Sequence, residues 1–126
     1  MIEKTDRIMM IDTETTNDID CPIVYDVGFE IFDLCGHTFA SESFVNADVF
    51  CDDVLMESAY FADKIPAYWE DIRNGKRRLA KWATIKNAIR KVCEAFGVKV
   101  VCAHNAPFDN RALNTTQRLI TSSKYR

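Results

Sequence analysis

The chain has 126 residues, the size of one domain, and its 48% hydrophobic and 28% charged residues are ordinary for a globular protein. Its net charge of −3 neither suggests nor excludes a nucleic-acid partner. No apolar stretch approaches the roughly 18 residues of a membrane span, and the N-terminus lacks a signal peptide's basic start and apolar run, so we expect one cytoplasmic domain, residues 1–126, with no membrane partner.

Three strands are predicted in the first half of the chain. Arg7–Thr13 is a short apolar run, Val24–Phe32 alternates in part, and His37–Val45 follows a turn at Cys35-Gly36. Because the connections are short, these strands are expected to form an antiparallel meander.

Helical segments are predicted to follow the meander. Cys51–Tyr60 has a helix-like pattern, whereas Lys64–Gly75, which contains Pro66 and an Asn-Gly pair, is predicted to be irregular, with a short turn of helix as the alternative. Lys76–Phe96 is the clearest helix, and Gly97 ends it. Its apolar stripe recurs at three- and four-residue steps: Leu79, Trp82, Ile85, Ile89, Val92 and Phe96.

The last predicted elements are a buried strand at Val98–Ala103 and a helix from Pro107 onward. A strand that follows a helical crossover usually lies parallel to its neighbour in the sheet. The predicted fold class is therefore α/β: a mixed sheet of three antiparallel strands and a later parallel one, flanked by helices.

The five cysteines are odd in number, and no two of them have C-x-x-C spacing. This argues against a disulfide framework and against a zinc ribbon. We expect reduced thiols that serve as small buried apolar groups.

Charge is distributed unevenly along the chain. Residues 1–70 hold 16 Asp/Glu and 3 Lys/Arg, whereas residues 71–126 hold 3 Asp/Glu and 13 Lys/Arg. This asymmetry suggests one face for cations and another for a polyanion, with a solvated basic helix as the alternative. The basic side chains would track a phosphate backbone only if several share one exposed face: Lys76, Arg77, Arg78, Lys81, Lys86, Arg90 and Lys91.

Two carboxylates stand at the end of the first predicted strand, in the segment Ile-Asp-Thr-Glu-Thr-Thr. Asp12 and Glu14 are two positions apart, so they point to the same face of a strand and repel each other. A hard divalent cation, Mg²⁺ or Mn²⁺, between them would explain the arrangement. The alternative is a pair of solvated acids. Thr15 and Thr16 follow, and their hydroxyls and amides are candidates for nucleotide contacts.

A second group of candidates follows the last predicted strand. Asp109 lies near the carboxyl end of that strand, the usual place for sites on such sheets, and would face Asp12 if the two strands are neighbours. Structural alternatives exist for each residue of the group. Asp109 could complement the positive end of a helix, and Asn105 could cap a turn. Phe108 could belong to the core, and His104 could be a structural histidine with its hydrogen bonds satisfied.

Together the two motifs resemble those of the DEDD superfamily of 3′→5′ exonucleases, the DnaQ-like type with a ribonuclease H-like fold. IDTETT is similar to its first motif and AHNAPFDNRAL to its second, and the segment PIVYDVG is similar to its second strand. The resemblance implies two metal ions, Mg²⁺ or Mn²⁺. Asp12 would bridge both, Glu14 would bind the nucleophile-side ion and Asp109 the other. It also implies that Thr15, Thr16, His104, Asn105 and Phe108 contact the 3′-terminal nucleotide.

The family's third motif, a His or Tyr shortly before a fourth metal-binding Asp, has no match, because no acidic residue follows Asp109. We therefore expect a C-terminally incomplete exonuclease domain that acts weakly or not at all on DNA or RNA 3′ ends. A catalytically dead nucleic-acid-binding or interaction module is the alternative, and an endonuclease of the same fold is a further rival. Without another strand, Val98–Ala103 would expose a sheet edge that invites self-association.

Overall fold

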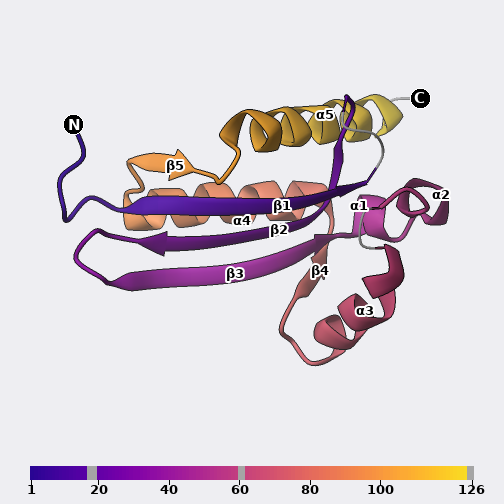
Figure 1. Ribbon diagram of the computed structural model, residues 1–126, viewed down its shortest axis with the longest axis horizontal. Helices are drawn as coiled ribbons and strands as arrows, with labels where there is room; N and C mark the ends of the chain where they lie inside the picture. The colour runs from indigo at the N-terminus through magenta and orange to yellow at the C-terminus, as the bar shows by residue number, and fades with distance from the viewer. Residues whose placement is uncertain (17–19, 60–61, 125–126) are drawn as a thin grey trace.

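The computed structural model describes residues 1–16, 20–59 and 62–124, and the side chains of residues 62 and 121–124 lie outside that description (Figure 1). It contains a five-stranded mixed sheet with helices packed on it. The α/β fold class is therefore confirmed.

The sheet has the strand order β4-β3-β2-β1-β5. Strands β1 (Ile8–Thr16), β2 (Ile23–Phe32) and β3 (Thr38–Asn46) form the antiparallel meander expected from their short connections. Strand β5 (Val100–Cys102) lies parallel to its neighbour, as predicted, and that neighbour is β1; the strand is shorter than predicted and is not buried. Strand β4 (Arg78–Ala80), which lies parallel to β3, was not predicted.

The helices correct two of the predictions. Short helices α1 (Ala47–Phe50) and α2 (Asp53–Met56) follow β3, and the predicted end of this helical region, Tyr60, lies outside the described residues. A 3₁₀ turn, η1 (Ala62–Lys64), leads into helix α3 (Ile65–Arg73). The prediction of irregular structure there was wrong. Its proline lies in the first turn, where a missing N–H breaks no helical hydrogen bond.

The long helix predicted from Lys76 begins only at Trp82. Helix α4 is Trp82–Phe96, because the preceding segment pairs with β3 as β4. Leu79, predicted on the apolar stripe, lies instead in that short edge strand. Gly97 ends α4 in the left-handed conformation at φ 62°, as predicted. Helix α5 (Ala106–Lys124) completes the described elements.

Helices α4 and α5 cover the same face of the sheet. Buried side chains of both helices join one core cluster with Met9, Ile11 and Phe29 of the strands. A second cluster lies at one end of the opposite face, where Tyr25 and Val45 pack against α1, α2 and α3. Among the described elements, no helix crosses the middle of this second face (Figure 1).

The cysteines differ from the expectation. All five thiols are free, which agrees with reduced residues, but none of them is buried. Cys21, Cys35 and Cys51 are exposed, since they lie in connections rather than on the core-facing side of a strand or helix. No helix in the described part of the chain is long and apolar enough to cross a membrane.

An irregularity in the β1–β2 ladder is stabilised by side chains from distant elements. The register shifts between Glu14 and Thr15, next to Val24 of β2. The Val24 N–H donates to Oγ1 of Thr116 on α5 at 2.8 Å, and the Val24 carbonyl accepts from Nδ2 of Asn46 at 3.0 Å. Both partner side chains are fully buried, so the backbone groups beside the shift are satisfied without water.

We predict that Thr116→Val lowers the free energy of unfolding by about 1–3 kcal/mol, because the buried Val24 N–H loses its acceptor while the side-chain volume is nearly kept. Urea denaturation monitored by circular dichroism measures this. Thr115→Val, one position earlier on α5, is the matched control and should change stability by no more than about 0.5 kcal/mol. Equal effects of the two substitutions would contradict the role given to Thr116.

Candidate functional site

The two carboxylates of the first motif lie on the face of β1 that α4 and α5 do not cover. Alternation along the strand places Ile11 and Thr13 toward the helices and Asp12 and Glu14 on the opposite side. Asp12 is exposed and Glu14 is half-buried. Neither forms a hydrogen bond or an ion pair with any other described residue.

The neighbouring strands extend this face into a shallow depression. Asp12 lies opposite Gly28 of β2, and Glu14 lies opposite Asp26. Gly28 leaves room in front of Asp12, since a Cβ there would meet only the Glu42 carbonyl oxygen at 3.9 Å. The resulting hollow of about 450 Å³, here called the acidic hollow, has these polar lining residues: Asp12, Glu14, Asp26, Ser43, Lys64, Tyr68, Asp71 and Arg77.

Asp26 is the centre of a buried network in the acidic hollow. Its Oδ2 accepts from the Tyr68 hydroxyl at 2.6 Å and from Nη1 of Arg77 at 2.9 Å. The Arg77 Nε also donates to Oδ2 of Asp71 at 3.0 Å, and its guanidinium lies 4.3 Å from the centre of the Tyr68 ring. This network ties α3 and the segment before β4 to the middle of the sheet.

Burial changes the protonation of two carboxylates at this site, Glu14 and Asp26. Burial raises the pKa of Glu14 above its ordinary value of 4.5, and the charges of Asp12, Asp26 and Asp109 raise it further. Burial also raises the pKa of Asp26, although its bonds from Tyr68 and Arg77 oppose that shift. The ionised forms of Glu14 and Asp26 are therefore disfavoured in the acidic hollow, and a bound cation would stabilise them.

A buried hydroxyl lies close to these carboxylates. The Tyr25 hydroxyl has no hydrogen-bond partner among the described residues, since Tyr68, which packs edge-on against it, donates to Asp26 instead. Burial raises the pKa of Tyr25 to about 12, and the nearby charges of Glu14 and Asp26 contribute. Tyr25 thus stays a neutral donor at physiological pH.

The expectation that Asp109 joins Asp12 and Glu14 in one pocket is not met in this structure. Its Oδ1 accepts a hydrogen bond from the Thr13 hydroxyl at 2.5 Å, on the helix-covered side of β1. It is buried in the first turn of α5 and lines a different hollow, with Ile11 and Leu113. Among the described residues, no three His, Cys, Asp or Glu side chains are grouped closely enough to hold a metal ion.

The two threonines after the acidic pair have different environments. Thr16 is fully buried, and its hydroxyl donates to the Leu55 carbonyl and lies 3.1 Å from the Ser58 hydroxyl. It therefore connects the end of β1 to the α2 region and does not reach solvent here. Thr15 is half-buried, immediately after the register shift. Neither lines the acidic hollow.

The remaining candidates of the second motif build the start of α5. The Asn105 carbonyl accepts from the backbone N–H groups of Phe108 and Asp109. Phe108 packs against the core cluster, and the Arg111 guanidinium lies 5.6 Å from its ring centre. His104 is exposed. These contacts agree with the structural alternatives for Asn105 and Phe108, and the structure does not bring either residue, or His104, to the acidic hollow.

Four residues of the predicted basic set have different contacts. Arg77 faces the acidic hollow, whereas Arg78 on β4 forms an ion pair with Glu42 at 3.2 Å. Lys81 precedes α4 and lines a separate hollow. Arg90, on α4, contacts Glu94 and Asn87 of its own helix. Arg77, Arg78, Lys81 and Arg90 thus lie in different surroundings.

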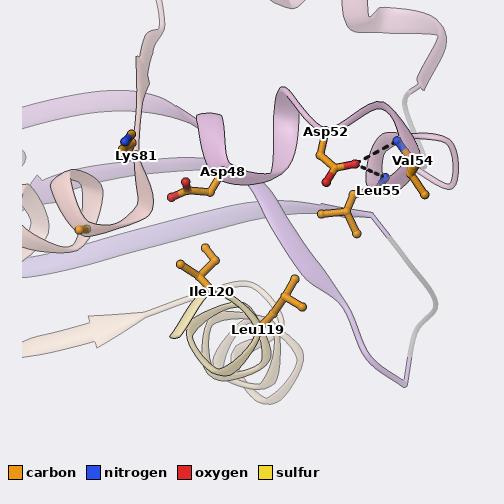
Figure 2. Close-up of a pocket in the computed structure, with 8 residues that line it drawn as sticks. Asp48, Asp52, Val54, Leu55, Lys81, Leu119 and Ile120 are labelled. Atoms are coloured by element: carbon orange, nitrogen blue, oxygen red, sulfur yellow. Dashed lines mark hydrogen bonds between the residues drawn. The ribbon is translucent and has the colours of Figure 1, made fainter. Parts of the chain in front are cut away.

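That separate hollow, of about 600 Å³, lies between the α1–α2 segment and α5 (Figure 2). Leu119 and Ile120 of α5 face the α1–α2 segment across it, and Asp52 accepts from the N–H groups of Val54 and Leu55. Lys81 of the basic set lines it, but none of the predicted metal-binding or nucleotide-binding residues does.

The acidic hollow offers the type of ligand that a hard divalent cation prefers, but few such ligands among the described residues are free to bind it. Asp12 and Glu14 offer carboxylate oxygens that no cationic side chain holds within ion-pair distance in the described chain, and such oxygens are what Mg²⁺ and Mn²⁺ prefer. Waters usually complete the coordination of such ions. Asp109 would join them only by exchanging its bond to Thr13.

The sequence did not single out Asp26 or Tyr68, and it indicated Arg77 only as one member of the basic set. Asp26 was quoted only as part of a strand pattern, although a charged residue between two apolar strand neighbours is a signal for a polar face. Arg77 was assigned to a helix, and nothing in its local sequence indicates a partner 51 residues away. Its partnership follows from the pairing of β4 with β3, which the sequence did not reveal.

A comparison with protein-family models gives no match, and a comparison with curated protein sequences gives none either. The family resemblance therefore depends on the two motifs, the PIVYDVG segment and the order of the strands.

We predict that Glu14→Gln raises the free energy of unfolding at pH 7, by at most about 1 kcal/mol, because solvent screens this half-exposed group. The folded chain holds the Glu14 proton more tightly than the unfolded chain. The gain should therefore be complete above the raised folded-state pKa and disappear as pH falls to 4.5 and below. Thermal melts across this range measure the difference.

The exposed Glu57, changed to Gln, serves as the control and should show no such pH-dependent gain. A Glu14→Gln variant that is less stable than the wild type at pH 7 would contradict the crowding of charge described above.

Proposed function

We propose that this chain is a metal-dependent 3′→5′ exonuclease domain of the DEDD (DnaQ-like) type, with a ribonuclease H-like fold, that acts on the 3′ ends of single-stranded DNA or RNA in the cytoplasm. The observation that carries the proposal is the pair Asp12 and Glu14, side by side on the uncovered face of β1 without a cationic partner within ion-pair distance among the described residues. Three antiparallel strands followed by a strand parallel to the first support the fold assignment.

The proposed chemistry divides between the chain and the cation. When bound, Mg²⁺ or Mn²⁺ lowers the pKa of a coordinated water and neutralises charge on a phosphate. Asp12 and Glu14 would hold the metal through their carboxylate oxygens, and Asp109 is the third candidate ligand. The polar lining of the acidic hollow would position the terminal phosphodiester next to them. Thr15, His104 and Phe108 stay candidates for contacts with the nucleotide.

Low activity is expected of these 126 residues. Only three of the four carboxylates of the DEDD arrangement have a match, and one of the three is bonded to Thr13. The same bond favours the second candidate function, a catalytically dead module that binds nucleic acid or another partner. In such a module Asp109 keeps α5 attached to β1, and no metal chemistry is needed.

We predict that Mn²⁺ binds the chain weakly and that Asp12→Asn abolishes this binding, because one of two hollow-facing carboxylate ligands is removed. Isothermal titration with MnCl₂ measures the affinity. Asp53→Asn, at an exposed position on α2, is the control and should bind Mn²⁺ like the wild type. Absence of Mn²⁺ binding to the wild type would favour the dead module.

Digestion of an end-labelled single strand with Mn²⁺ should be slow or undetectable, and any activity should spare a circular single strand. Cleavage of the circle would support an endonuclease instead. Fast digestion that Asp12→Asn abolishes would overturn the expectation of an incomplete active site.

We further propose that the chain self-associates along β5. In the described sheet this strand is an edge with β1 as its neighbour, and its Val101 side chain is 56% exposed. An apolar edge with unpaired backbone groups is a template for pairing with a second copy. The occupant proposed for this edge is therefore β5 of another molecule.

We predict that the wild type gains mass with concentration in size-exclusion chromatography with light scattering, and that Val101→Lys reduces this gain because a charged edge strand resists pairing. Val54→Lys, which changes a more exposed valine on α2, is the control and should behave like the wild type. A wild type that stays monomeric at high concentration would contradict this proposal.

A further inference from the structure

Arg77 lies at the rim of the acidic hollow in a fixed orientation. Its Nε donates to Asp71, its Nη1 donates to Asp26, and the face of its guanidinium covers the Tyr68 ring. Nη1 is also 3.4 Å from the Ser43 hydroxyl. The contacts come from β2, β3 and α3, so three separate elements restrain one side chain whose exposed fraction is 26%.

One end of this guanidinium remains available. Among the described residues, Nε and Nη1 have partners, whereas Nη2 has none within hydrogen-bonding distance. Burial alone would lower the pKa of Arg77, but the charge of Asp26 and the bond to Asp71 raise it, so the charge is permanent. An oriented guanidinium with unused N–H groups is the side-chain chemistry that recognises phosphate oxygens.

The net charge of the acidic hollow determines the conditions under which a phosphate could bind there. Four carboxylates and two basic side chains line it, which leaves a balance of two negative charges. A phosphate group alone would be repelled by that balance, whereas a single divalent cation would cancel it. Affinity for a phosphate should therefore depend on the cation.

We propose that Arg77 is a phosphate-binding residue of the acidic hollow, and that its Nη2 group donates to a phosphate oxygen of a nucleotide that binds together with a divalent cation at Asp12 and Glu14. This inference depends on the proposed function and adds to it the residue that holds the substrate phosphate. Asp26 and Asp71 act through Arg77, as positioning residues.

The test uses the 126-residue chain, MnCl₂ and a nucleoside 5′-monophosphate, thymidine or adenosine, the product class of a 3′→5′ exonuclease. Isothermal titration gives the affinity for Mn²⁺ alone and then for the monophosphate with and without Mn²⁺. We expect monophosphate binding only with Mn²⁺. Arg77→Lys keeps a positive charge beside Asp26 but removes Nη2, and should weaken monophosphate binding about tenfold or more while Mn²⁺ affinity stays unchanged.

Arg78→Lys is the matched control, because Arg78 is the next residue and pairs with Glu42 at an exposed position. It should bind both ligands like the wild type. Arg77→Lys with unchanged monophosphate affinity and unchanged Mn²⁺ affinity overturns the inference and leaves the proposed function in place. No Mn²⁺ binding to the wild type overturns the proposed function, and this inference with it.

A second variant keeps the test decisive if Arg77→Lys does not fold. Asp71→Asn leaves Arg77 in place but removes the charge that orients its Nε. If orientation matters, monophosphate binding with Mn²⁺ should weaken severalfold, although a repelling carboxylate has been removed. Stronger binding would show that Arg77 contributes charge alone, and would contradict its role as an oriented donor.

Discussion

The two-residue alternation of β1 is the constraint on which the candidate site depends. One side of the strand carries Met9, Ile11 and Thr13 and is buried under α4 and α5, so the other side must carry Asp12 and Glu14. Because α5 packs on the buried side of β1, its residue Asp109 lies on that side. A carboxylate that lies on the same face and lines the same hollow as the acidic pair comes from the neighbouring strand, and it is Asp26.

Much of the fold could be predicted from the sequence, because it depends on local signals. Short connections predicted the meander, and a glycine predicted the end of α4. Strand β4 was missed because three residues carry too little periodicity to distinguish them from the start of the adjacent helix. Helix α3 was missed because Pro66 indicates a break, although a proline in a first turn is compatible with a helix.

The candidate site was predictable in part for the same reason. The acidic pair follows from strand alternation, which is local. The side of β1 that Asp109 approaches depends on how α5 packs, and the partners of Asp26 depend on the course of the chain through α3 and β4. Those are long-range properties. Neither is encoded in the spacing of the motif residues.

The acidic first half and the basic second half of the chain form ion pairs with each other within the molecule. Arg77 pairs with Asp26, Arg78 with Glu42, and Lys99 with Asp6, and each pair joins the basic half to the acidic half. Part of the charge that suggested a surface for a polyanion thus holds the sheet together. Most of these pairs are partly exposed and contribute little stability individually. Arg77 differs because its partner is buried.

The pairing of β5 with β1 has a consequence for the order in which the molecule assembles and opens. The meander forms between strands that are close in the chain, whereas the Thr13–Asp109 bond closes a separation of 96 residues. Closure of so long a loop costs more chain entropy than closure of a hairpin. We therefore expect the meander, with Asp12, Glu14 and Asp26 already on one face, to assemble before α5 docks. In the folded protein, amide protons of β5 and the first turn of α5 would then exchange with solvent through partial opening that leaves the central strands intact.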